Sequence, residues 1–383
     1  MPDICLYFQA HQPHRLRRVS PLDIGRGQKP FDTYLNSQIL HRVADLCYLP
    51  MNTLLKKLIL AYPSQFSVAF SLSGCLLDQL GDWRPEVIAS FQELAATGRV
   101  EFLGETYEHS LSYVFDRDEF DRQLNAHREV IHRLFGQQTK VFRHTELIYT
   151  NSLADHIAQK GFRGILTEGA DRLLEENSPN RLYSSKGLNP IPLMLRDYRR
   201  SDDIAFRYND PEWEYSPLDP NVFQGWIHES EGDLVNIFMD YETFGEHQSD
   251  HSDLFTFFSQ WIEQAVVSNQ FLLPSEVLEK HIPSDSLDVP DYVSWADTSR
   301  SLQAWLGNEL QQDALRKVIS LKQSLCRQHP EIWRRLLQSD HFYYMATGEG
   351  PDAEVHEYFS PYKSPYDAYL VYMNVLSNLE SSL

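Results

Sequence analysis

The stretch Val141-Phe-Arg-His-Thr-Glu146-Leu decides the fold, together with a second one, Val235-Asn-Ile-Phe-Met-Asp240-Tyr-Glu-Thr-Phe-Gly-Glu-His247. Each begins with β-branched and aromatic residues, which predict a buried strand, and each opens directly onto carboxylates. An α/β barrel presents its catalytic groups at the carboxyl ends of its strands. The two stretches therefore predict an enzyme that works with two carboxylates, Glu146 and Asp240.

The second stretch is rich in acids. Asp240, Glu242 and Glu246 lie close together with His247, and no Lys or Arg stands among them to neutralise their charge. Acids that follow a strand also cap helices or face water, so either stretch taken alone has a purely structural interpretation. Crowded like charges, however, raise one another's pKa, as a general acid that works near neutral pH requires.

Short apolar segments recur between helical patterns and predict the rest of a parallel sheet. Most are near-continuous apolar runs, the type that is buried on both faces in such sheets. The alternation of strand and helix favours an α/β fold with right-handed crossovers, as in a barrel. The predicted strands are residues 4–9, 66–71, 100–103, 140–143, 164–167, 204–208 and 234–239.

Helical patterns fill the segments between these strands. A capping pattern at Asp116 and Glu119 begins a helix that Gly136 ends, and a second helix is expected from Asn151 to Gly161. The composition of residues 168–232, rich in Pro, Asn, Ser, Arg and Tyr, predicts long loops over one barrel face.

Beyond residue 250, helical spacing replaces the alternating pattern, in residues 254–267, 275–281, 299–327 and 365–379. We therefore expect two parts: a catalytic barrel over residues 1–250 and a C-terminal helical region over residues 251–383.

The composition argues against several classes of function. The 383 residues carry 54 acids against 34 bases, and the net charge of −20 makes nucleic acids and anionic membranes poor partners. No apolar run approaches the roughly twenty residues of a membrane span, and the N-terminus lacks a signal-peptide pattern. The four cysteines show no CxxC spacing, so we expect a cytoplasmic protein without structural zinc. The oligomeric state stays open.

Histidines follow two further predicted strands. His11-Gln12-Pro13 comes after the first strand, where Pro13 forces the backbone to turn, and Glu105 and His109 follow the strand at 100–103. A metal-dependent hydrolase such as a carbohydrate deacetylase is the alternative interpretation, although the spacings are not diagnostic of a metal site. The residues that would supply its ligands are His11, His14, His109, His144, Asp240 and His247.

Aromatic residues are plentiful, and Trp295 and Trp305 stand out in Trp295-Ala-Asp297 and Trp305-Leu-Gly-Asn308. Most aromatic side chains belong to a core. Sugar rings, however, bind by stacking on aromatic faces and by hydrogen bonds to carboxylates and amides, so an acidic cleft with aromatic walls fits a neutral sugar polymer.

The chain resembles glycoside hydrolase family 57, whose members act mainly on α-glucans, and the resemblance is closest to the α-amylase branch. Five separated blocks in order carry it, which makes it specific. They are His11-Gln-Pro13, Gly104-Glu-Thr-Tyr-Glu-His109, Arg143-His-Thr-Glu146, Asp240-Tyr-Glu-Thr-Phe-Gly-Glu-His247, and Trp295-Ala-Asp297 with Trp305-Leu-Gly-Asn308.

The resemblance implies a (β/α)7 incomplete TIM-type barrel followed by a C-terminal α-helical bundle. It implies a retaining enzyme without cofactor or metal, with Glu146 as nucleophile and Asp240 as general acid/base, acting on an α-glucan or maltooligosaccharide. Hydrolysis, 4-α-glucanotransfer and a non-catalytic sugar-binding role remain open at this point. The residues expected to bind substrate are His11, Gln12, Glu105, His109, Arg143, His247 and Trp295.

Overall fold

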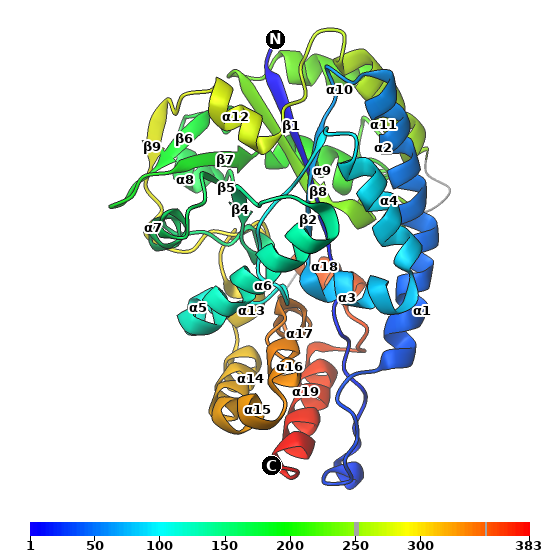
Figure 1. Ribbon diagram of the computed structural model, residues 1–383, viewed down its shortest axis with the longest axis vertical. Coiled ribbons are helices and arrows are strands. Elements are labelled where there is room, and N and C mark those ends of the chain that lie inside the picture. The colour runs from blue at the N-terminus through cyan, green and yellow to red at the C-terminus, as the bar shows by residue number, and fades with distance from the viewer. Residues whose placement is uncertain (249–252, 349–350) are drawn as a thin grey trace.

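The computed structural model describes residues 1–248, 253–348 and 351–383, and it has a mixed α/β fold. Figure 1 shows two sheets in the upper part, helices along their outer sides and a further group of helices below. Within the described residues, every helix is too short or too polar to cross a lipid bilayer.

The first sheet has the strand order β3-β2-β1-β8, and all of its pairs are parallel. Every residue of β1 is buried, as expected for a strand covered on both faces. Gln9 at the end of β1 pairs with Asp240 at the end of β8, so the segments that follow these two strands begin at the same edge. The strands are β1 Asp3–Ala10, β2 Val68–Leu72, β3 Val100–Phe102 and β8 Leu234–Asp240.

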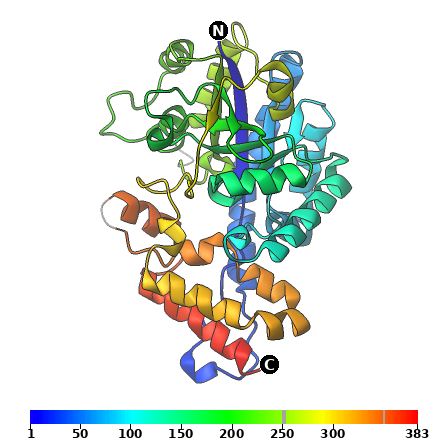
Figure 2. The ribbon, with the colours of Figure 1, turned by 90° about the vertical axis from the view of Figure 1, so that its left-hand side faces the viewer.

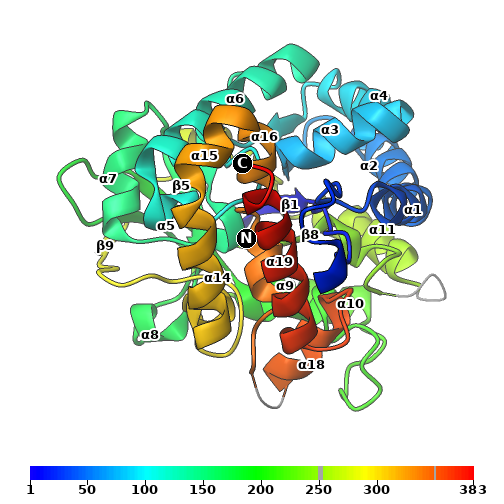
Figure 3. The same cartoon turned by 90° about the horizontal axis from the view of Figure 1, so that it is seen from below.

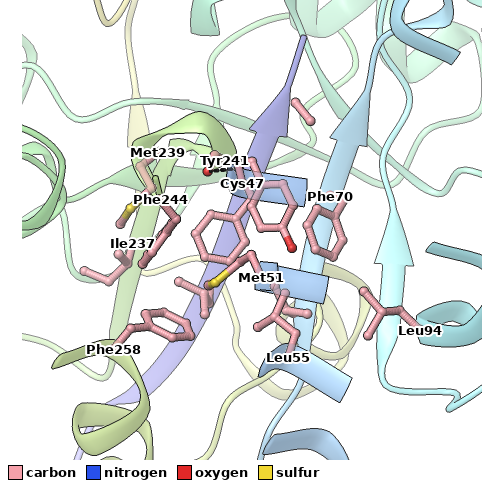
Figure 4. Close-up of a cluster of buried hydrophobic side chains, with 14 of the residues drawn as sticks. Cys47, Met51, Leu55, Phe70, Leu94, Ile237, Met239, Tyr241, Phe244 and Phe258 are labelled. Atoms are coloured by element: carbon pink, nitrogen blue, oxygen red, sulfur yellow. Dashed lines mark hydrogen bonds between the residues drawn. The ribbon is translucent and has the colours of Figure 1, made fainter. Parts of the chain in front are cut away.

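Helices α2 (Leu49–Ala61), α4 (Pro85–Ala95) and α11 (Leu254–Ala265) cover the outer face of this sheet (Figure 1). Figure 4 shows the core between them, where Tyr241 and Phe70 from the sheet side meet apolar side chains of the helices. The ring centroids of Tyr241 and Phe70 are 5.1 Å apart in an edge-to-face arrangement. Because α11 contributes to this core, residues 254–265 pack against the first sheet and not against the helices that follow residue 302.

The second sheet has the order β4-β5-β7-β6-β9, in which β4, β5 and β7 are parallel and β6 is antiparallel to β7. A bridge between Gly104 and Phe142 joins the end of β3 to β4. A Cβ at Gly104 would lie 2.6 Å from the Phe162 ring, so a larger residue at this junction would force that buried ring to move. The strands are β4 Val141–Arg143, β5 Gly164–Glu168, β6 Leu182–Ser185, β7 Pro192–Arg196 and β9 Asp285–Leu287.

Most predicted elements of residues 1–167 are confirmed. The helix predicted after Asp116 is α6, whose first turn is capped by the Asp116 carboxylate and which ends at Gly136 with φ of 69°. α6 spans Arg117–Phe135, and the other α-helices that accompany the two sheets are α1 Thr33–Val43, α3 Gly74–Trp83, α5 Ser112–Phe115, α7 Asn151–Gln159, α8 Asp171–Leu174, α9 Tyr198–Ala205, α10 Pro220–His228 and α12 Pro274–Lys280.

The prediction of long loops over residues 168–232 is wrong, because this segment contains β6, β7, α8, α9 and α10. The strand predicted at 204–208 is wrong as well. Asp197 caps helix α9 by accepting from the Arg200 N–H at 3.1 Å, and the helix buries Ser201, Ile204 and Ala205 at helical spacing.

The C-terminal helices have a separate apolar core, built around Trp305, Trp333 and Tyr372. Figure 2 shows this group below the sheets, and Figure 3, seen from below, shows α14, α15 and α19 lying across their end. The helices are α13 Gln303–Leu306, α14 Glu309–Ser320, α15 Lys322–Gln328, α16 Pro330–Arg335, α17 Ser339–Tyr343, α18 Pro351–Phe359 and α19 Pro365–Glu380.

The single helix predicted over 299–327 is divided into α13, α14 and α15. Asn308 ends the continuity, because its side chain accepts from the Gln311 N–H at 2.9 Å and starts a new helix there. The predicted boundary between residues 250 and 251 falls in 249–252, outside the described residues.

An N-terminal strap, residues 14–32, leaves the sheet after β1 and packs along α19. The Arg18 guanidinium holds the Asp367 carboxylate with two bonds of 2.8 and 2.7 Å. The Asn378 amide donates to the Gln28 carbonyl at 2.9 Å, and the Asn374 amide donates to the Val19 carbonyl at 3.0 Å. The strap therefore ties the first strand's connection to the C-terminal helical group.

Candidate active site

A cavity of about 620 Å³ opens at the carboxyl ends of β1 and β8 and beside the turn that follows β4. Its size is that of a typical small-molecule site. Its lining comes from two sides. The ends of the strands supply His11, Glu146 and Asp240, and the C-terminal helical group supplies Asp340, Tyr343, Tyr344 and part of α18.

Glu146 lies in the 3₁₀ turn Thr145–Leu147 that follows β4, with φ of 58° and ψ of 26°. This is the left-handed region, which a residue with a Cβ adopts at a cost. The Trp295 N–H donates to the Glu146 carbonyl at 3.2 Å and helps to hold the turn. Such a strained backbone at the edge of a cavity is typical of functional positions.

Three donors hold the Glu146 carboxylate. His109 Nε2 lies 3.2 Å from Oε1, and the Ser339 hydroxyl donates to the same oxygen at 2.9 Å. The Trp295 indole N–H donates to the other oxygen, Oε2, at 2.7 Å. All three donors favour the ionised carboxylate.

His109 lies between two carboxylates, with Nδ1 3.1 Å from Glu105 Oε2 and Nε2 near Glu146. Burial opposes protonation of the ring, but the hydrogen bonds and charges of Glu105 and Glu146 raise the pKa of His109 to about 9. Burial would likewise raise the pKa of Glu146, but the hydrogen bond from His109 and the charges of His109 and Arg143 lower it below its usual value. At neutral pH, Glu146 is therefore a carboxylate beside an imidazolium.

Asp240, at the end of β8, has the opposite character. Burial raises the pKa of Asp240, the charge of Glu146 raises it further, and together they bring it to about 6. One cavity thus holds a carboxylate that stays ionised and a carboxyl group that keeps its proton up to mildly acidic pH. This separation of pKa values is how paired carboxylates divide the roles of nucleophile and acid.

Glu242 lies behind Asp240 and accepts from the His11 N–H at 3.1 Å and from the Tyr48 hydroxyl. Burial and the nearby charge of Asp240 raise the pKa of Glu242 to about 8. Of the acids clustered in the sequence, Asp240 and Glu242 therefore lie close enough in the structure for the charge of one to raise the pKa of the other.

His11 and Gln12 line the cavity, as predicted for substrate-binding residues. Both ring nitrogens of His11 have protein partners: Nε2 lies 2.9 Å from Asp340 Oδ2, and Nδ1 lies 2.8 Å from the Ser73 hydroxyl. Gln12 accepts from the Arg15 guanidinium at 3.1 Å through its side-chain oxygen. The surface that His11 offers to the cavity is therefore its ring, because both of its nitrogens are bonded to protein groups.

Glu105 and Arg143 do not line the cavity. Glu105 is fully buried beneath His109, and the Ser71 hydroxyl also donates to it. Arg143 is fully buried with its Cζ 4.9 Å from the centre of the Trp295 ring, and none of its guanidinium nitrogens has a hydrogen-bond partner among the described residues. The two residues are placed to support the cavity wall, not to contact a substrate within it.

His247 and Trp295 lie on the cavity wall, as the sequence predicted. The His247 ring packs edge-on against Phe359 of α18, with ring centroids 4.9 Å apart, and burial lowers the pKa of His247 to about 4. Within the described part of the chain, no three His, Cys, Asp or Glu side chains are grouped so that they could hold a metal ion.

Several residues of the cavity wall were not predicted from the sequence. Most belong to loops and short helices of the C-terminal group, whereas Arg196 is the last residue of β7 and Asp202 lies in α9. They include Arg196, Asp202, Arg300, Asp340 and Tyr343, with Ser339 bound to Glu146 beside them.

Known proteins resemble this chain in sequence and in fold. The family model of glycosyl hydrolase family 57 matches residues 5–290. A protein of Methanocaldococcus jannaschii named "Putative alpha-amylase" is 36% identical over 396 residues, which cover 98% of this chain and 84% of that protein.

Two solved structures are similar in fold alone, because the identity to each is 16%. The GH57-type branching enzyme from Pyrococcus horikoshii has a TM-score of 0.66, over 94% of this chain and 87% of that one. The 4-alpha-glucanotransferase from Thermococcus litoralis has a TM-score of 0.59, and the match covers 90% of this chain but only 49% of that longer one.

Proposed function

The chain belongs to glycosyl hydrolase family 57, and from that premise we propose that it cleaves α-1,4-glucosidic bonds of an α-glucan with retention, like an α-amylase. Glu146 is the proposed nucleophile and Asp240 the proposed general acid/base. The observation that carries the proposal is the pair itself: one ionised carboxylate and one carboxyl group of raised pKa in the same cavity.

In the first step, an oxygen of Glu146 attacks the anomeric carbon while the glycosidic C–O bond breaks. Asp240 gives its proton to the departing sugar oxygen, so the leaving group is a neutral alcohol. His109, cationic and hydrogen-bonded to Glu146, keeps the nucleophile ionised before attack. A glycosyl ester on Glu146 and an Asp240 carboxylate result.

In the second step, Asp240 removes a proton from an incoming hydroxyl, which attacks the anomeric carbon and releases Glu146. Water as the acceptor gives hydrolysis, and a sugar hydroxyl gives transfer to a second glucan. Two inversions at the same carbon restore the original configuration.

The strand arrangement supports an incomplete (β/α)7 barrel followed by a C-terminal helical bundle, which we propose as the domain organisation. Seven parallel strands follow the order β8-β1-β2-β3-β4-β5-β7 through the sheet pairs and the bridge at Gly104. The Asn236 amide of β8 donates to the Leu195 carbonyl of β7 at 2.8 Å, which brings the two end strands together. A cytoplasmic location is also proposed, supported by four cysteines that are all free.

The test is incubation with maltoheptaose, with products separated by chain length and the anomer of the first product identified by NMR. We expect shorter maltooligosaccharides of α configuration, with longer products if transfer competes. Glu146→Gln should abolish the reaction, because an amide cannot form the glycosyl ester, and azide should restore some activity to Glu146→Ala by entering the vacated space. Products of β configuration, or an active Glu146→Gln, would refute the assignment.

A further inference from the structure

Ser339, the first residue of α17, connects the two residues that hold the nucleophile. Its N–H donates to the His109 carbonyl at 3.0 Å, and its hydroxyl donates to Glu146 Oε1 at 2.9 Å. Ser339 is fully buried, and the preceding residue, Gln338, forms a bridge with Ser110 and accepts from the His14 N–H at 2.9 Å. The start of α17 is thus fixed to the backbone around His109, which itself has φ of 52°.

Asp340, the next residue, reaches the same pair by a second route. Its carboxylate lies 2.9 Å from His11 Nε2, and the His11 ring is stacked on the His109 ring with centroids 4.1 Å apart and planes at 21°. The Asp340 carboxylate accepts a hydrogen bond from the Nε2–H of His11. Nδ1 of His11 is then unprotonated and accepts a hydrogen bond from the Ser73 hydroxyl. One face of the His109 ring is therefore covered by a ring whose orientation Asp340 fixes.

We propose that Ser339 and Asp340 are positioning residues for the nucleophile: Ser339 orients the Glu146 carboxylate directly, and Asp340 orients it through His11 and His109. This inference rests on the proposed function of Glu146. Both residues lie beyond residue 290, where the match to the family model ends, so it does not reach them.

The donor arrangement also assigns the attacking atom. A carboxylate oxygen has two lone pairs in the carboxylate plane, and Oε1 receives both His109 Nε2 and the Ser339 hydroxyl. Among the described residues, Oε2 receives a hydrogen bond from the Trp295 indole alone, which leaves its second lone pair for the substrate. In the attack, Oε2 forms a bond to the anomeric carbon while the glycosidic C–O bond breaks and Asp240 gives its proton to the departing oxygen. Oε1 becomes the carbonyl oxygen of the ester and still accepts from Ser339.

The first experiment compares Ser339→Ala, Ser339→Cys and Ser339→Thr with wild type on maltooligosaccharides. A hydrogen bond to a charged group contributes a factor of roughly ten to a hundred, so kcat should fall by about that factor in the Ala and Cys variants. KM should change less than threefold or so, because ground-state binding is not made through Ser339. Thr keeps the hydroxyl and should recover most of the rate, whereas Cys keeps the shape but donates weakly.

The matched control is Ser67→Ala. Ser67 is also fully buried and donates to a carbonyl, that of Phe271 at 2.6 Å, but it lies at the opposite end of β2 from the cavity. It should lower thermal stability like Ser339→Ala and leave kcat unchanged. Equal kcat in Ser339→Ala and wild type, or an equal loss of kcat in the Ser67 control, would overturn the proposal.

A second measurement does not depend on activity. Titration of 13C-labelled glutamate carboxyls by NMR should show a higher pKa for Glu146 in Ser339→Ala, because a donor to the ionised form is lost. Asp340→Asn should instead lower the pKa of Glu146, because the like charge of Asp340 raises that pKa and is lost in this variant. The charged and titratable groups that face Glu146 are His109, Arg143, Asp240, Asp340, Tyr343 and Tyr344, and Glu105 lies beyond His109 on its Nδ1 side.

Failure of the proposed function and failure of the positioning role would give different results. A wild-type enzyme without activity on any α-glucan would refute the proposed function, while the NMR titration still decides whether Ser339 supports the Glu146 carboxylate. An unchanged Glu146 pKa in a folded Ser339→Ala protein would refute the positioning role even in an active enzyme.

Discussion

The two walls of the cavity differ in what they carry and in what holds them. The strand-end wall carries the groups whose protonation is set by burial and charge, Glu146, Asp240 and Glu242. It stands on parallel strands with a fixed register, in which Gln9 pairs with Asp240.

The helical wall carries hydrogen-bond donors and aromatic rings, and it is held by side-chain contacts between α18 and the loop around Asp297. His356 of α18 lies 2.7 Å from Asp297 Oδ1, and the Thr298 hydroxyl donates to Asp352 at 3.0 Å. We infer from this difference that the proposed reacting groups belong to the wall built on strands, while the other wall orients the proposed nucleophile and contributes to ligand selection. Substitutions on the first wall should change the chemical step, and substitutions on the second should have smaller effects on orientation or affinity.

Replacement of the proposed acid is expected to have the largest effect. Asp240→Asn should reduce kcat on maltooligosaccharides by roughly 10³-fold, within the range for loss of general acid catalysis. An aryl glucoside with a good leaving group needs less protonation, so its first step should lose far less. Equal losses on both substrates would show that Asp240 does not protonate the leaving group.

The pH profile tests the same wall without mutation. Since Asp240 must be protonated and burial with the charge of Glu146 raises its pKa to about 6, kcat/KM should fall about tenfold per unit above that pH. The acidic limb belongs to Glu146, whose pKa is lowered by His109 against the effect of burial. A profile that stays flat to pH 8 would contradict the assignment.

Asp240 should also lower the free energy of unfolding at pH values at which its carboxyl group is ionised. Its pKa is raised from an ordinary 3.8 to about 6, so the unfolded chain releases this proton first and stability falls as pH rises from about 4 to about 6. Asp240→Asn should therefore stabilise the protein at pH 7 by about 1 to 3 kcal/mol, and by almost nothing at pH 3.5. Urea unfolding at the two pH values measures this, with the exposed Asp291→Asn as a control that should show no such difference.

On the helical wall, Trp295→Phe keeps a ring but removes the indole donor to Glu146 Oε2. We expect about a tenfold loss of kcat, the effect of one hydrogen bond to a charged group. The control is Trp305→Phe, because Trp305 is fully buried and its indole nitrogen has no partner in the described residues. Trp305→Phe should lower the stability of the protein and leave kcat unchanged. A larger loss of kcat in Trp305→Phe than in Trp295→Phe would contradict the proposed difference between the two walls.

The smallest effect is expected at the rim. Tyr358 of α18 lines the cavity with 58% of its surface exposed, so its ring is free to stack on a sugar. Tyr358→Ala should raise KM by about threefold to fivefold for long glucans only, with kcat unchanged. Tyr366→Ala on α19, where Tyr366 is 65% exposed away from the cavity, is the matched control. Equal KM values for Tyr358→Ala and wild type at every chain length would remove α18 from substrate binding.

Sequence patterns predicted the strand-end wall because its residues follow strands within a few positions. Glu146 and Asp240 could be placed by the apolar runs before them, and β1, β4, β5 and β8 lie where the pattern put them. The helical wall could not be predicted in the same way. Ser339 follows no strand and belongs to no motif, and its meeting with Glu146 depends on the packing of α17 against the segment around His109.

The errors in residues 168–232 have a related cause. Strands β6 and β7 are short and pair antiparallel to each other. β6 ends in two serines, and the apolar run of β7 begins with a proline, which argues against a central strand. Their pairing is determined by β5 next to β7, which periodicity along the chain cannot reveal.

The N-terminal strap has a consequence for synthesis of the chain on the ribosome. β1 is made long before its neighbour β8, and the strap of residues 14–32 bonds to α19 near the end of the chain. The edge of β1 that pairs with β8 therefore stays open to chaperones and to other nascent chains until residues 234–240 are made, and the strap waits longer still, for residues 365–380.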